Sequence, residues 1–276
     1  MLLCLLMFRL FYTITFNNQL HSFHLVAPSP CPFYMAVSAH VTAWGLIFYF
    51  QTGIYILFLT GFMSVQYILY EWLYCVFIEA TIQGNHTSLT RRCLRFGWAL
   101  FIVSEAMLFF SFFWSFCWFA SSPNIHIGCT WPPAGIEKVT WTGIPLLNTF
   151  ILIYSGIMLT ISHQYLVAHK FIFSNSYLKF TLYLAVSFSV LQGYEYYNCS
   201  FTIACSSYGS AFYMLTGLHG LHVLVGSIFL ETQRRRLTSF HFHSNSHIGL
   251  ECGIWYWHFV DIVWILLFFV VYVLLS

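Results

Sequence analysis

Glu105 is the residue whose type and position most directly suggest chemistry. It lies near the middle of an apolar and aromatic run, residues 97–120, that is long enough to cross a bilayer. A charged side chain at the bilayer centre costs about 2.5–3.5 kcal/mol on insertion scales. In the first interpretation this carboxyl is functional: it handles protons, or it stays protonated and binds a partner helix. In the second it makes a structural hydrogen bond with no further role. We favour the first interpretation because ionisable groups inside a membrane are rare and usually functional.

Four more polar residues within apolar runs could meet Glu105 or one another. They are His219, His222, His258 and Asp261. His219 and His222 are one helical turn apart, and we expect one of them to hydrogen-bond Glu105, since an imidazole supplies a partner that lipid cannot. Without further ligands nearby in sequence, this histidine pair does not predict a metal site. His258 precedes Asp261 by three residues, so the two share a helix face and can neutralise each other, which favours a structural role.

A third polar cluster is expected on the basic side of the membrane. Its members flank the ends of the second and sixth apolar runs: Trp72, Glu79, His86 and Arg236. Basic pockets between helices on this side bind anionic lipid headgroups. Ordinary interfacial anchoring by tryptophan and arginine explains the same residues equally well, so both interpretations stay open.

The remaining histidines do not indicate a cofactor. Two haems held by two helices would require two axial histidines, several turns apart, on each helix, and no apolar run has them. The segment between the sixth and seventh apolar runs contains His241, His243 and His247, which we expect in a solvated polar loop. The residues therefore predict neither a catalytic group nor a bound metal in this chain.

The composition indicates a membrane protein. Charged residues make up 7% of the 276 and aromatic residues 21%, whereas soluble domains are about 25% charged. The formal net charge of +2 is too small to indicate nucleic-acid binding. Nine cysteines, an odd number without Cys-x-x-Cys spacing, argue against a disulfide framework and a zinc ribbon, and we expect buried free thiols.

Seven apolar runs each approach the roughly 20 residues that a spanning helix requires. This pattern predicts an all-α, polytopic membrane protein with seven transmembrane helices. The runs lie near 33–50, 54–73, 97–120, 144–168, 177–197, 208–230 and 252–275. The second and fifth runs are less clear than the others, because charged residues lie near their ends: Glu71, Lys179 and Glu195. Residues 1–20 form an N-terminal extension before a single transmembrane domain, residues 21–276.

Charge asymmetry predicts the orientation of these helices. If seven spans alternate, nine basic residues fall on the N-terminal side of the membrane and only Lys138 on the other. The nine are Arg9, Arg91, Arg92, Arg95, Lys170, Lys179, Arg234, Arg235 and Arg236. The positive-inside rule then places the N-terminus on the cytoplasmic or matrix side.

Several long motifs resemble cytochrome c oxidase subunit III. They are His24-Leu25-Val26 with Pro28-Ser29-Pro30, Glu79 through Thr87, Ser104-Glu105, Trp131-Pro132-Pro133, Ile144 through Thr149, Glu195-Tyr196-Tyr197, Tyr208 through His222, and Trp255 through Asp261. The resemblance covers about residues 21–275 in order. It implies a non-redox core subunit of respiratory complex IV that stabilises the catalytic subunit, maintains its proton uptake and supports oxygen reduction coupled to proton pumping.

The resemblance also implies an arrangement and a set of partners. The first two helices would stand apart from the other five, with phospholipids held in the cleft between them. The family's intramembrane glutamate falls on Glu105, and its headgroup contacts fall on Glu79, His86 and Arg236. Haem and copper would lie in partner subunits, among which subunits I and II and accessory subunits are expected. Where the family usually has arginine, this chain has Ile78, which weakens the implied headgroup site.

The implied location is the mitochondrial inner membrane, with the N-terminus on the matrix side and the C-terminus on the intermembrane-space side. A stand-alone polytopic transporter is the alternative function, and a haem-binding cytochrome is another. The transporter would show a substrate path, and the cytochrome a Soret band in the isolated chain. No internal repeat that would favour a transporter is evident.

Overall fold

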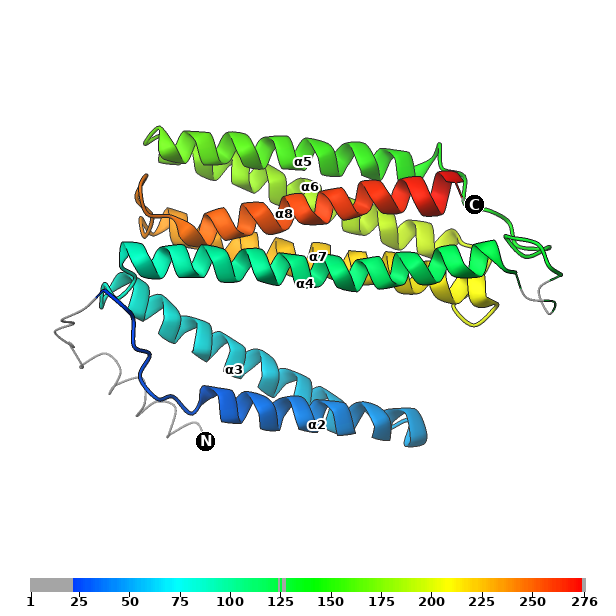
Figure 1. Cartoon of the computed structure of the whole chain (residues 1–276), viewed down its shortest axis with the longest axis horizontal. Helices are drawn as coiled ribbons and strands as arrows, with labels where there is room; N and C mark the ends of the chain where they lie inside the picture. The colour runs from blue at the N-terminus through cyan, green and yellow to red at the C-terminus, as the bar shows by residue number, and fades with distance from the viewer. Residues whose placement is uncertain (1–21, 124, 126–127, 275–276) are drawn as a thin grey trace. The chain divides into compact units, whose positions relative to one another are not determined.

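The computed structural model describes residues 22–123, 125 and 128–274. The predicted N-terminal extension, with Arg9, lies outside the described residues. Within these residues the regular secondary structure is helical, apart from one isolated antiparallel β-bridge between His243 and Ser246. The elements are α2 (Cys31–Thr52), α3 (Ile56–Thr81), α4 (Ser88–Ser121), α5 (Ile144–Val167), α6 (Phe171–Asn198), α7 (Ser207–Thr238), α8 (Ile248–Leu267) and a terminal π-helix, η2 (Phe268–Leu274). The predicted all-α membrane fold is confirmed (Figure 1).

Six stretches of the described chain are long and apolar enough to cross a membrane: α2, α3, α4, α5, α7, and α8 with its π-helical end. The predicted span at 177–197 does form a helix, α6, but that helix does not reach the same apolarity. Lys179, one third of the way along the helix, and Glu195, near its end, lower its mean hydropathy. Its inward face, which includes Leu178, Ala185 and Phe188, packs into the core of the protein.

Three helices extend well beyond their predicted bounds. The apolar run 54–73 belongs to a helix that continues to Thr81, the run 97–120 to one that begins at Ser88, and the run 208–230 to one that continues to Thr238. Hydropathy detects only the part of a helix that fits the hydrocarbon core, whereas the backbone hydrogen-bond ladder continues into the headgroup region. Glu79 and Arg95 therefore lie inside helices rather than in connections.

The chain divides into two compact units, with the boundary inside α4 between Leu94 and Arg95. In the first unit α2 packs against α3. Gly53 ends α2 in the left-handed conformation, at φ 74°, and its N–H donates to the Tyr49 carbonyl oxygen at 2.8 Å. A side chain at Gly45 would meet the Phe58 backbone, and one at Gly61 would meet Thr42. The two glycines thus allow the helix backbones to approach closely, as small residues do in membrane proteins.

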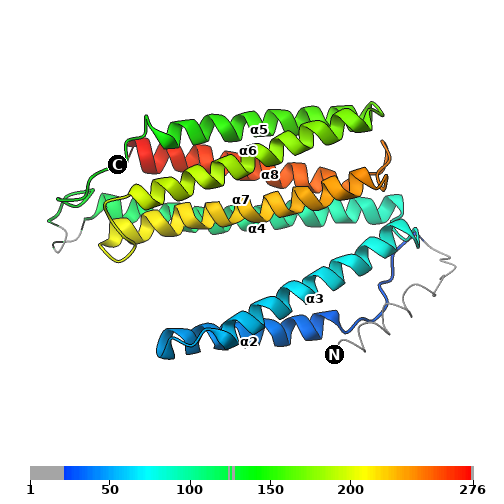
Figure 2. The same ribbon diagram turned by 180° about the vertical axis from the view of Figure 1, so that it is seen from behind.

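The second unit is built on four mutually packed helices, with α5 against α6 and α8, and α7 against the same two. α4 runs beside them (Figures 1 and 2). Proline in the first turn starts α5, and the Ser206 hydroxyl caps α7 by accepting a hydrogen bond from Gly209 N–H. The core is aromatic-rich: Trp257, Trp264 and Phe188 are at most 1% exposed. This core holds the polar side chains of α7 and α8 in fixed positions.

Candidate functional site

The carboxyl of Glu105 on α4 meets the His222 side chain on α7. His222 Nε2 lies 2.9 Å from Glu105 Oε2, and the two side chains are 7% and 21% exposed. Of the two histidines predicted as partners, His222 makes this contact. His219, one turn earlier, is fully buried, and its Nε2 instead donates to the Val260 carbonyl oxygen at 3.2 Å. His219 therefore serves to join α7 to α8.

The second ring nitrogen of His222 determines how many protons the pair can share. His222 Nδ1 lies 2.8 Å from the Leu218 carbonyl oxygen. A carbonyl oxygen only accepts, so Nδ1 carries a hydrogen. The contact to Glu105 then holds one proton, located either on the carboxyl of a neutral pair or on Nε2 of an ion pair. This geometry allows a proton to pass between Glu105 and His222 without a change in the total charge of the pair.

Aromatic rings surround the Glu105–His222 pair. The Phe109 ring meets the imidazole edge-on, with centroids 4.9 Å apart, and the Tyr256 ring stacks on it at 6.3 Å. Such apolar neighbours strengthen a hydrogen bond that is satisfied, because they exclude water that would compete for it. The pair therefore has the features of a fixed, largely desolvated site.

His258 and Asp261 form the other predicted intramembrane pair, on α8. His258 Nδ1 lies 3.7 Å from Asp261 Oδ2. The imidazole also reaches α5, with Nε2 3.3 Å from Thr160 Oγ1. A side chain at Gly156 would come within 2.6 Å of Asp261 Oδ2, so this glycine leaves room for the carboxylate. The geometry connects α5 and α8, and the structural role of the pair stays a prediction.

The prediction that His247 is a solvated loop residue is wrong. Its side chain is 5% exposed at the start of α8, and its Nε2 lies 2.9 Å from His163 Nε2 and 3.4 Å from Glu251 Oε1. The Glu251 carboxylate also accepts from Arg95 Nε at 2.7 Å and Nη2 at 3.1 Å. Hydropathy predicts a connection here. His247 is buried because His163 of α5 contacts it and Arg95 of α4 binds the neighbouring Glu251. The exposed residues His241 and His243 do match the expected loop.

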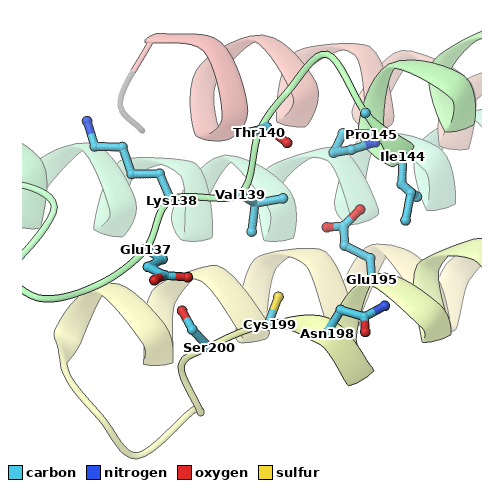
Figure 3. A pocket seen from close by; sticks show the side chains of 11 residues that line it. Glu137, Lys138, Val139, Thr140, Ile144, Pro145, Glu195, Asn198, Cys199 and Ser200 are labelled. Carbon is cyan, nitrogen blue, oxygen red and sulfur yellow. The ribbon is translucent and has the colours of Figure 1, made fainter.

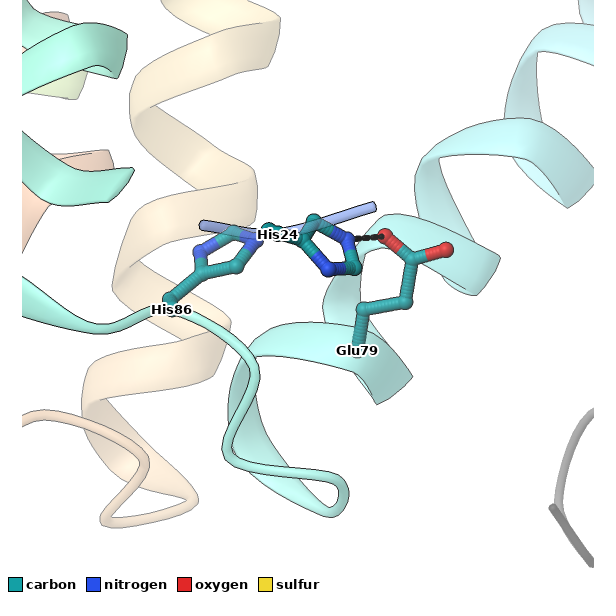
Figure 4. A group of neighbouring side chains, drawn as sticks. All are labelled: His24, Glu79 and His86. Carbon is teal, nitrogen blue, oxygen red and sulfur yellow. Dashed lines mark hydrogen bonds and ion pairs between the residues drawn. The ribbon is translucent and has the colours of Figure 1, made fainter. Parts of the chain in front are cut away.

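The polar cluster predicted on the basic side includes a residue that sequence spacing did not indicate. In the first unit, His24 Nε2 lies 3.1 Å from Glu79 Oε2, and the His24 and His86 ring centroids are 5.9 Å apart (Figure 4). His24 is 55 residues from Glu79 in sequence, so no local pattern could have paired them. Trp72 is half-buried on α3, about 10 Å before Glu79 along the helix axis.

Arg236 belongs to the second unit. It lies near the end of α7, half-buried, with its guanidinium carbon 4.7 Å from the centre of the Phe242 ring. Its Nη1 donates to Gln233 Oε1 at 3.2 Å. The ring and the amide hold the guanidinium in one orientation, which suits recognition of a planar or tetrahedral anion.

A pocket of about 290 Å³ opens between the loop before α5 and the end of α6 (Figure 3). Glu137 and Lys138 lie on the loop, and the carboxyl of Glu195 points into the pocket from α6. Glu195 is 4% exposed, and its Oε1 accepts from the Tyr272 hydroxyl at 2.7 Å. This hydrogen bond joins α6 to the π-helical end of the chain and keeps the carboxyl at the pocket wall.

Comparison with known proteins shows which family this chain resembles in sequence. A family model described as cytochrome c oxidase subunit III matches residues 21–276. The chain is 45% identical over 252 residues to cytochrome c oxidase subunit 3 of Anopheles quadrimaculatus, covering 91% of this chain and 96% of the relative. It is 42% identical over 255 residues to the protein of the same name from Coturnix japonica, covering 92% and 98%. The corresponding protein of Pisaster ochraceus is 42% identical over 252 residues, covering 91% and 97%.

Proposed function

Because this chain belongs to the cytochrome c oxidase subunit III family, we propose that it is a non-redox core subunit of a cytochrome c oxidase, respiratory complex IV, in the mitochondrial inner membrane. The single observation that carries the proposal is the family match, which extends over residues 21–276. Its partners are the catalytic subunit I, subunit II and accessory subunits. In this proposal haem and copper belong to those partners, and oxygen reduction takes place there.

The contribution of this chain to proton pumping is assigned to Glu105 and His222. The pair shares one proton between Oε2 and Nε2, which are 2.9 Å apart. It can therefore take up or release that proton while the surrounding aromatic rings keep bulk water away. Through such exchange the subunit would keep proton uptake by the catalytic subunit steady, without carrying an obligatory proton itself.

Phospholipid binding is the second part of the proposed role. A guanidinium held in place matches a phosphate by two parallel hydrogen bonds, and Arg236 is held by Phe242 and Gln233. Trp72, Glu79 and His86 are the other residues assigned to headgroups. Bound lipid would stabilise the catalytic subunit during turnover.

The proposed orientation follows from charge. Arg91, Arg92 and Arg95 begin α4, and Arg234 to Arg236 end α7. With these residues on the matrix side, the N-terminus faces the matrix and the C-terminus the intermembrane space.

Co-purification from solubilised membranes tests the assignment to the oxidase. A tag on this chain should bring down a larger subunit that carries haem and copper, together with oxygen-consuming activity. Recovery of this chain alone, with solute transport after reconstitution into vesicles, would instead support a stand-alone transporter. A Soret band in the isolated chain would refute the non-redox assignment.

Glu105→Gln is expected to leave the complex assembled and its rate of oxygen reduction near normal, while the number of protons pumped per electron falls in part. Glutamine retains the shape and a hydrogen bond to His222 but cannot release a proton. Loss of the charge-assisted component of that bond costs about 1.5–3 kcal/mol, too little to prevent assembly. Stopped-flow pH measurement on reconstituted vesicles gives the pumping ratio.

Glu137→Gln, which changes an exposed acid outside the helices, is the control. Loss of all oxygen reduction in a metal-replete Glu105→Gln complex would contradict the auxiliary role.

Arg236→Ala is expected to weaken phospholipid retention and to speed the loss of activity during turnover, with initial rates unchanged. The substitution removes a positioned cation worth about 1 kcal/mol near an anionic surface. Native mass spectrometry of the complex measures bound lipid. Arg235→Ala is the matched control, because its side chain is 77% exposed and adjacent in sequence. Equal lipid retention in both variants would refute the headgroup assignment.

A further inference from the structure

We propose that His163, His247 and Glu251 form a binding site for a divalent transition-metal ion of the zinc class. His163 lies near the end of α5, His247 directly before α8, and Glu251 in the first turn of α8. Each residue offers one ligand atom, and the three atoms lie within 4.8 Å of one another. A bound ion joins the end of α5 to the start of α8. The site uses no residue assigned to proton exchange or to phospholipid.

The distances between the ligand atoms match a tetrahedral ion. Zinc binds two histidines and one glutamate in sites that keep a fourth position open. Two ligands at 2.0–2.1 Å from such an ion are about 3.3 Å apart. His247 Nε2 lies 2.9 Å from His163 Nε2 and 3.4 Å from Glu251 Oε1. Both separations are within about 0.5 Å of the tetrahedral value, a difference that small side-chain rotations correct.

The three ligand atoms have too few hydrogens to satisfy one another. His247 Nδ1 lies 3.1 Å from the His243 carbonyl oxygen, which only accepts, so in the neutral ring Nδ1 carries the hydrogen and Nε2 has a free lone pair. His163 Nε2 places one hydrogen between the two rings, which leaves Glu251 Oε1 facing His247 Nε2 as a second acceptor. A metal ion accepts a lone pair from all three atoms at once. When it binds, the His163 hydrogen moves to Nδ1, so both rings stay neutral.

Neighbouring groups already orient the ligands as a metal site requires. A histidine that binds a metal almost always donates its other ring N–H to a carbonyl, a carboxylate or water, and His247 Nδ1 makes this contact with His243. Carboxylate ligands are likewise hydrogen-bonded, and Glu251 accepts from Arg95 Nε at 2.7 Å and Nη2 at 3.1 Å. A carboxylate has about four lone-pair sites, so Oε1 can bind an ion while Arg95 stays in place. The ligands are therefore positioned before an ion binds, which reduces the entropy lost on binding.

Exposure and charge at the site favour a transition metal. The Arg95 and Glu251 side chains are 38% and 19% exposed, whereas His247 is 5% exposed, so an ion can enter from the side of the carboxylate and then bind the buried imidazole. Arg95 neutralises the charge of Glu251, so the imidazole nitrogens rather than net charge must hold the ion. Calcium and magnesium bind oxygen ligands, whereas imidazole suits zinc, copper and nickel.

Zinc content of the purified complex tests the proposal. Wild-type, His163→Gln, His247→Gln and His241→Gln complexes are stripped with a chelator, equilibrated with zinc sulfate and desalted, and zinc is counted by elemental mass spectrometry. Wild type and His241→Gln, a control in an exposed loop, should each hold one zinc more than the other two. Zinc bound elsewhere is common to all four complexes, so the difference between them is decisive. Equal zinc in all four would overturn the proposal and leave His163 and His247 as a hydrogen-bonded contact.

A second measurement uses only the unaltered complex and so does not depend on assembly of the variants. Cu²⁺ binds a given nitrogen and oxygen site more tightly than Zn²⁺, and with ascorbate and oxygen it oxidises the residues that hold it. Copper sulfate should raise oxidation of His163 and His247 by more than about tenfold if they bind the ion, as located by peptide mass spectrometry, and should leave His241 unchanged. Excess zinc sulfate should reverse the increase, because the two ions compete for the same ligands. Equal oxidation of His163 and His247 with and without copper would refute the site.

Discussion

Trp257→Ala is expected to destabilise the second unit by about 3–5 kcal/mol, the cost of removing a large aromatic side chain from a packed core. Trp257 is fully buried on α8, and its Nε1 donates to Ser155 Oγ on α5 at 2.9 Å. On its other side α7 approaches the indole at Gly226, where a Cβ would be 3.2 Å from the ring. One side chain thus fills the space among three helices, and its loss leaves a cavity that rigid helices cannot close. The free energy of unfolding, measured by SDS titration in bicelles, reports the change.

Two companion variants distinguish the cavity from other causes. Trp257→Phe keeps most of the ring and loses the hydrogen bond to Ser155, so it should cost about 1–3 kcal/mol, the range for a buried partner left unsatisfied. Trp255→Ala removes the same type of side chain two residues away, where it is 42% exposed. It should change stability by less than about 1 kcal/mol. Equal losses in Trp257→Ala and Trp255→Ala would contradict the proposed role of the buried indole.

Gly45→Ala is expected to separate α2 from α3 and to destabilise the first unit by about 1–3 kcal/mol, the range for overpacking. The added methyl group would meet the Phe58 backbone and lie 2.7 Å from the Leu57 carbonyl carbon. A neighbouring side chain could rotate away, but backbone cannot move without shifting the whole helix. Hydrogen–deuterium exchange should become faster at amides of α2 and α3 while those of α8 stay protected.

The control for Gly45 is Gly193→Ala. Gly193 lies inside α6, where an added Cβ meets nothing within 4 Å. Alanine is favoured over glycine in a helix by about 0.5–1 kcal/mol, so this substitution should be neutral or slightly stabilising. Unchanged exchange rates in Gly45→Ala would show that the helices do not depend on this close approach.

The sequence by itself determined the helices and their membrane character. Apolar runs of about 20 residues can satisfy their backbone hydrogen bonds in lipid only as helices or closed barrels, so composition and length predicted a helix at each of α2 to α8. The predicted span at α6 does not reach the apolarity of the other six. One end each of α3, α4 and α7 was placed too close to the centre of the membrane, because the apolar runs stop at residues 73, 97 and 230 while the helices continue. Glu105 was also identified from its position alone, since a carboxyl in an apolar run is conspicuous.

Only the tertiary structure decided which side chains meet. His219 and His222 are both candidates by spacing, but the way α7 packs brings His222 to Glu105 on α4 and His219 to the Val260 carbonyl oxygen on α8. His24 reaches Glu79 across 55 residues of chain, and His247 is buried by helices that are distant in sequence. Periodicity describes one helix at a time, whereas these contacts depend on how side chains of different helices pack together. The membrane fold could therefore be read from the sequence, whereas the contacts between polar side chains of different helices could not.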